Sequence, residues 1–159
     1  MSGLPQVHPA GKPAHSPPDA RHQSITVNHR LTVFIEQPPE FVRKLYPSAV
    51  WRMDPDERAV YLTFDDGPIP EVTPWVLDLL DKYDIKATFF MVGDNIRKHP
   101  DEFQMVVERG HRIGNHTFNH LRGFEYNFKD YLANAEKANE VMKTDLFRPP
   151  HGHMGWTQY

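Results

Sequence analysis

The sequence contains no cysteine among its 159 residues. This absence excludes disulfide bonds, thiolate zinc sites and cysteine nucleophiles, so any metal ion has to be bound through His, Asp or Glu. The chain also lacks an apolar run of transmembrane length, and its N-terminus has neither the basic region nor the apolar core of a secretory signal. These features leave the localisation open: the chain as it stands is consistent with the cytoplasm, and a role at the cell envelope is the alternative.

A block of basic residues is also missing from the chain. The formal net charge is −3, because 21 Asp and Glu residues outnumber 18 Lys and Arg residues. We therefore do not expect nucleic acid as a partner. Nor do we expect a membrane segment in the chain. Hydrophobic residues make up 39% of the sequence and charged residues 25%, which indicates a globular domain diluted by polar segments.

The composition divides the chain into three parts. Residues 1–30 contain five prolines and four histidines but few large apolar side chains. We expect them to form a disordered tail, because they bury too little apolar surface to offset the loss of conformational entropy. Residues 31–56 are interpreted as a flanking segment of short pieces interrupted by proline. Residues 57–159 are interpreted as the main domain.

Strand and helix patterns alternate along this domain. Short apolar runs predict strands at residues 59–64, 85–92, 112–115 and 146–147, and amphipathic patterns predict helices at 74–83, 100–109 and 128–143. This order predicts βαβ units with a parallel sheet in an α/β fold. For the first helix, the pattern predicts an N-cap at Thr73 and a core face made of Trp75, Val76, Leu79, Leu80 and Tyr83.

Polar clusters follow three of the predicted strands. Asp65 and Asp66 follow the first strand, the segment 116–120 follows the third, and the segment 148–153 follows the fourth. Taken alone, Asp66-Gly67 is also an ordinary turn signal. Because the carboxyl ends of parallel strands open onto one face, we expect the three clusters to converge there.

His116 and His120 are the candidate metal ligands. A spacing of four places both imidazoles on one face of a helical turn, close enough to share an ion. With one carboxylate they form a set that leaves coordination positions open, and this set alone also permits an iron oxygenase. We expect Thr117 to hold the loop through backbone hydrogen bonds. We expect Arg148, followed by two rigid prolines, to orient its guanidinium beside a carboxylate.

Three segments resemble the first three motifs of the polysaccharide deacetylase family, the NodB-homology domain or carbohydrate esterase family 4. They are residues 63–68 (TFDDGP), 116–120 (HTFNH) and 148–152 (RPPHG). The resemblance covers about residues 57–159 and implies a distorted (β/α) barrel. It also implies a divalent metal, with zinc ahead of cobalt or nickel, and hydrolysis of acetyl amides or esters on a glycan such as peptidoglycan or a chitin-type polymer.

The resemblance further implies roles for individual residues. Asp65 is similar in position to the general base of the family, and Arg148 to the residue that orients this base. Asp66, His116 and His120 are similar in position to the metal ligands. The proton on the attacking water would thus move to one aspartate while the neighbouring aspartate binds the ion.

The segment after Arg148 departs from the family pattern in part. Pro149 and the backbone N–H near His151 correspond to the oxyanion and substrate site, but His151 replaces a residue that is often Tyr. The later family motifs, which supply the catalytic acid, are absent, and His151 or His153 is left as a candidate acid. We therefore expect a barrel truncated after about half to two-thirds of its length. A non-catalytic domain that binds glycan or metal is the alternative.

Overall fold

The structure is a computed structural model that describes residues 39–54 and 56–159. The tail expected at residues 1–30 and the first part of the flanking segment lie outside the described residues. In chain order the helices and strands are α1 (Glu40–Leu45), β1 (Thr63–Asp65), α2 (Val72–Lys82), β2 (Thr88–Met91), α3 (Gly93–Lys98), α4 (Pro100–Glu108), β3 (Arg112–Asn115) and α5 (Phe128–Met142). Short 3₁₀ turns follow at Gly123–Glu125, Pro150–Gly152 and Trp156–Gln158. Across these residues no helix is both long enough and apolar enough to cross a bilayer.

The strands form a parallel sheet in the order β1-β2-β3, which confirms the predicted α/β class. The register pairs Phe64 with Phe89 and Phe89 with Ile113. The predicted fourth strand is reduced to a single parallel bridge between Asn115 and Phe147. The first strand is shorter than predicted, and Val60 is 86% exposed, because β1 pairs with β2 alone in the described part of the chain.

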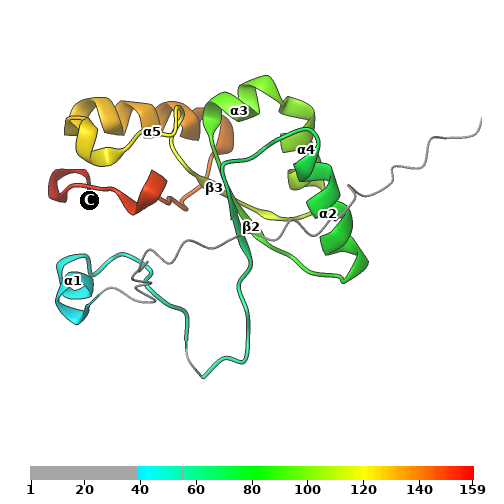
Figure 1. Cartoon of the computed structure of the whole chain (residues 1–159), viewed down its shortest axis with the longest axis horizontal. Coiled ribbons are helices and arrows are strands. Elements are labelled where there is room, and N and C mark those ends of the chain that lie inside the picture. Colours follow the sequence, from blue (N-terminus) through cyan, green and yellow to red (C-terminus); the bar gives the residue numbers. More distant parts are fainter. Residues whose placement is uncertain (1–38, 55) are drawn as a thin grey trace, which may run out of the picture. The chain divides into compact units, whose positions relative to one another are not determined.

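The core lies between one face of the sheet and the helices α2, α3, α4 and α5, which Figure 1 shows beside the strands. Phe89 and Met91 alternate along β2 and join this core, since neighbouring strand residues point to opposite faces. Full burial of a side chain such as Met91 or Leu77 contributes about 1.5–3 kcal/mol. The buried cluster comprises Leu77, Leu80, Ala87, Phe89, Met91, Ile96, Val106, Phe118, Ala138 and Met142.

Helix α2 corrects two of the sequence predictions. Its N-cap is Glu71, and the hydroxyl of Thr73 inside the helix accepts a hydrogen bond of 2.8 Å from the Ile69 N–H. The buried positions are Thr73, Leu77 and Leu80, whereas Trp75 is 57% exposed. Positions separated by four and three residues make one stripe at 3.6 residues per turn, and the predicted aromatic face is rotated away from it.

His111, just before β3, is a buried histidine outside the polar clusters. Its Nδ1 accepts a hydrogen bond of 3.3 Å from the Ala87 N–H, and its Nε2 has no partner in the described part of the chain. Desolvation is the main cause that lowers the pKa of His111 below 6.5, and the charge of Lys86 lowers it further. The unfolded chain therefore binds a proton more readily than the folded chain does.

This depressed pKa predicts a loss of stability in acid. The contribution of His111 is fully present above pH 6.5 and declines as the pH falls through 6.5 toward the folded pKa. Each unit of pKa difference corresponds to about 1.4 kcal/mol. Urea unfolding from pH 7 to pH 5 should show a smaller loss for His111→Gln, which keeps an acceptor for Ala87, than for the unchanged chain. Parallel losses in the two proteins would show that His111 does not contribute.

Candidate active site

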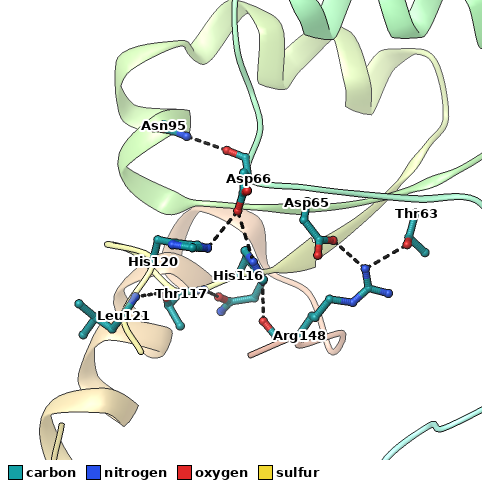
Figure 2. A network of polar contacts seen from close by, with 10 residues as sticks. Thr63, Asp65, Asp66, Asn95, His116, Thr117, His120, Leu121 and Arg148 are labelled. Carbon is teal, nitrogen blue, oxygen red and sulfur yellow. Dashed lines mark hydrogen bonds and ion pairs between the residues drawn. The ribbon is translucent and has the colours of Figure 1, made fainter. Parts of the chain in front are cut away.

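Two neighbouring carboxylates leave the end of β1 in different directions. Asp65 is the last residue of the strand, and Asp66 adopts a left-handed backbone conformation with φ of 72°. The backbone of Asp66 is held on both sides, because its N–H donates to the Phe90 carbonyl at 3.1 Å and its carbonyl accepts from the Asn95 amide at 2.7 Å. Figure 2 shows the Asp66 side chain directed toward two imidazoles and the Asp65 side chain toward a guanidinium.

Asp66, His116 and His120 form a compact group of possible metal ligands. One carboxylate oxygen of Asp66 lies 3.0 Å from His120 Nε2 and 3.5 Å from His116 Nε2. One ligand atom from each of the three residues lies within 4.8 Å of the other two. Two imidazole nitrogens and one carboxylate oxygen make a donor set typical of catalytic divalent metal sites.

The hydrogen bonding of His116 leaves the electron pair of its Nε2 atom facing the Asp66 carboxylate. Its Nδ1 lies 2.7 Å from the Arg148 carbonyl, which can only accept, so Nδ1 carries a proton and the electron pair of the neutral imidazole is on Nε2. His116 is 3% exposed, and desolvation is the largest effect that lowers the pKa of this imidazole. The Nε2 atom of neutral His116 and the carboxylate oxygen of Asp66 then both offer an electron pair to the space between them. The residues therefore fit a divalent metal ion.

The loop from His116 to His120 is not the helical turn that the spacing of four predicted. Thr117 and His120 adopt left-handed backbone conformations, with φ of 63° and 55°. The Thr117 N–H donates to the Asn115 side chain at 2.8 Å, and the Thr117 hydroxyl accepts from the Leu121 N–H at 3.1 Å. The two imidazoles thus lie together because of a hydrogen-bonded loop, and the helical explanation was wrong.

Asp65 and Arg148 form a second, separate pair beside the three ligand residues. The Arg148 guanidinium donates to Asp65 at 2.7 Å and to the Thr63 hydroxyl at 3.0 Å. Its carbon lies 4.0 Å from the centre of the Phe90 ring, on the sheet face opposite Phe89. A planar guanidinium held by stacking and two hydrogen bonds fixes the direction of the Asp65 carboxylate.

A polar pocket of about 310 Å³ lies beside this group, lined by Asp66, Val92, Asp94, Asn95, Asn119 and His120. The ring of His151, which follows Pro149 by two residues, lies 4.8 Å from that of His120. His153 continues the row, with its ring 5.8 Å from that of His151. All three polar clusters of the sequence therefore meet at the carboxyl ends of the strands.

Sequence reasoning missed four polar residues that hold these segments. Asn115 is the last residue of β3, where the same reasoning that singled out Asp65 applies, whereas Thr63 begins β1 and Asn95 lies in α3. Asn134 lies inside α5, far along the chain from the residues it contacts. Its one signal in the sequence is that Asn is an unfavourable residue in a helix interior.

Comparison with known proteins identifies the family of the chain. Residues 52–157 match the family model described as polysaccharide deacetylase. The chain belongs to this family. The fold type implied by the sequence resemblance is therefore confirmed, and the polysaccharide deacetylase motifs are the segments that converge in Figure 2.

Two curated relatives and a solved structure illustrate the similarity. A peptidoglycan-N-acetylglucosamine deacetylase of Bacillus cereus is 40% identical over 109 residues, which cover 65% of this chain and 51% of the relative. A chitooligosaccharide deacetylase of Rhizobium leguminosarum bv. trifolii is 46% identical over 65 residues, which cover 41% of this chain and 30% of the relative. The structure of the Bc1960 peptidoglycan N-acetylglucosamine deacetylase aligns with a TM-score of 0.62 and 36% identity, covering 65% of this chain and 51% of that one. The chain thus spans about half the length of the B. cereus relative.

Proposed function

We propose that this polysaccharide deacetylase family member removes acetyl groups from a carbohydrate polymer in a reaction that depends on a divalent metal ion, with zinc as the first choice. The observation that carries the proposal is that a set of three candidate metal ligands and a separate carboxylate–guanidinium pair lie side by side at the strand ends. Asp66, His116 and His120 offer ligand atoms within 4.8 Å of one another, and the 2.7 Å contact between Asp65 and Arg148 lies beside them.

The division of work follows from the chemistry of these side chains. Asp66, His116 and His120 would hold the ion, which when bound polarises an acetyl carbonyl and lowers the pKa of water. Asp65 accepts the proton of the attacking water, because its carboxylate lies beside the ligand group without belonging to it and is paired with Arg148 instead. Arg148 keeps this carboxylate in one orientation through two hydrogen bonds.

The substrate is proposed from chemistry and similarity together. The relatives described above are named for deacetylation of peptidoglycan N-acetylglucosamine and of chitooligosaccharide, so we propose N-acetyl groups on amino sugars as the target. The backbone at Pro149 and His151, next to His120, is the proposed contact for the developing oxyanion and the sugar. With peptidoglycan as substrate, the site of action would be the cell envelope.

Acetate release tests the proposal. The full chain loaded with zinc should release acetate from N-acetylglucosamine oligomers or from peptidoglycan, should stop when a chelator removes the ion, and should resume when zinc returns. Binding of the oligomers without acetate release would instead favour a non-catalytic glycan-binding domain. Oxygen uptake with ferrous iron and a keto-acid would favour the oxygenase that the ligand set alone permits.

A further inference from the structure

The loop that carries both candidate histidine ligands has a strained backbone. Thr117 and His120 adopt φ values of 63° and 55°, in the left-handed region. For a residue other than glycine, this backbone conformation costs on the order of 1–2 kcal/mol. Such a loop keeps its shape only if its surroundings hold it, and the relative placement of the imidazoles of His116 and His120 depends on that shape.

A single side chain from α5 forms hydrogen bonds with the middle of this loop. The amide oxygen of Asn134 accepts hydrogen bonds from the Phe118 N–H at 2.9 Å and from the Asn119 N–H at 3.0 Å. Its amide nitrogen donates to the Asn119 side chain at 2.9 Å. Three hydrogen bonds from one residue thus fix two consecutive loop residues, and the second of them directly precedes His120.

The next residue of α5, Ala135, holds the start of the loop as well. Asn115 accepts from the Thr117 N–H at 2.8 Å and donates to the Ala135 carbonyl at 2.8 Å, next to Asn134 in the helix. Helix α5 is itself closely packed against α3. A Cβ added to Gly93 would lie 3.2 Å from Ala138 of α5, and the Gly93 N–H donates to the Thr117 carbonyl at 3.0 Å. The loop is therefore fastened between two helices that have little room to shift.

We propose that Asn134 is a positioning residue of the metal site: it holds the 116–120 loop so that the imidazole nitrogens of His116 and His120 stay within reach of the Asp66 carboxylate. This inference rests on the proposed function. The hydrogen bonds of Asn134 in the described part of the chain end on the loop backbone and on Asn119, not on the three ligand side chains. Its effect on the metal is thus indirect, through loop geometry.

The test compares two asparagines of the same helix. Asn139 accepts from the Thr144 N–H at 3.0 Å, so it also fixes a loop N–H from α5, but that loop carries no candidate ligand. Zinc affinity of the full chain is measured by competition with a chelating dye. The zinc dissociation constant should rise about tenfold in Asn134→Ala, which is the lower end of the affinity losses seen when residues that orient metal ligands are replaced. Asn139→Ala should bind zinc within about twofold of the unchanged chain, whatever its Tm.

A conservative variant separates positioning from general destabilisation. Asn134→Asp keeps the oxygen that accepts from Phe118 and Asn119, so its zinc affinity should stay within about threefold of the unchanged chain. The visible absorption of bound cobalt should change in Asn134→Ala and remain as it is in Asn134→Asp. If Asn134→Ala does not fold, Asn134→Ser, whose hydroxyl is too short to accept from both N–H groups, provides the same comparison.

The outcomes distinguish this inference from the proposed function. Unchanged zinc affinity in Asn134→Ala, or an equal loss in Asn139→Ala, would overturn the positioning role while leaving the metal site intact. Failure of the unchanged chain to bind zinc at all would overturn the proposed function and the inference with it. Weak binding by Asn134→Ala, with near-normal binding by Asn134→Asp and Asn139→Ala, would establish the role.

Discussion

Zinc should be lost when His116 or His120 is changed to Ala, and it should stay bound when Asp65 is changed to Asn. The two imidazoles share the carboxylate of Asp66 at 3.5 Å and 3.0 Å, whereas Asp65 faces Arg148 at 2.7 Å. We expect zinc affinity to fall at least about 100-fold in either histidine variant. In Asp65→Asn the affinity should be retained, while acetate release falls by about 10²–10⁴ through loss of the general base.

A third histidine variant is the control for this experiment. His99, between α3 and α4, is not part of the ligand group, so His99→Ala should keep both zinc and activity. Zinc stoichiometry and acetate release are measured on the same preparations of the full chain. Equal loss of zinc in Asp65→Asn and His116→Ala would show that the roles of Asp65 and Asp66 are exchanged.

Arg148→Lys should reduce kcat by about 100-fold while zinc affinity changes little. One guanidinium nitrogen of Arg148 donates to both Asp65 and Thr63 while the planar group stacks on Phe90, and a lysine ammonium, which has no planar face, cannot reproduce this stacked orientation. The contact that Arg148 makes with His116 is through its backbone carbonyl, so the substitution leaves the ligand tautomer unchanged. Steady-state kinetics and zinc titration of the variant check the two halves of this prediction.

An arginine from another ion pair provides the control for Arg148→Lys. Arg109 contacts Asp78 at 2.7 Å and Asp81 at 2.9 Å, just before β3 and at the opposite end of the sheet from the site. Arg109→Lys should leave kcat unchanged. Full activity in Arg148→Lys would mean that Asp65 needs no orienting partner, and zinc loss in this variant would place Arg148 in the metal site instead.

The fold was predictable where local signals and packing agree. Strand β3 has the predicted bounds, Arg112–Asn115, because a turn precedes it and a parallel neighbour pairs along its whole length. Strand β1 begins later than predicted, since it pairs on one side only in the described part of the chain. The buried face of α2 was misjudged because large aromatics such as Trp75 outweighed smaller Thr73 in the pattern, whereas position relative to the sheet decides burial.

The convergence of Asp66, His116 and His120 was predictable from the sequence, but the contacts that hold the 116–120 loop were not. Asp66, His116 and His120 follow strand ends, and parallel topology alone brings strand ends together. The left-handed loop residues and the hydrogen bonds of Asn134 depend on contacts between segments distant in sequence. Neither hydrophobic period nor residue spacing encodes such contacts, so they appear only once α5 is placed against the loop.

The position of bound zinc shows directly which residues are the metal ligands. Anomalous diffraction at the zinc edge, on crystals of the zinc-loaded full chain, locates the ion without reference to activity. We expect one strong peak at about 2.0–2.2 Å from an Asp66 oxygen and from the Nε2 atoms of His116 and His120, with the Asp65 carboxylate still paired to Arg148. A peak coordinated by Asp65, or one held by His151 and His153 instead, would contradict it.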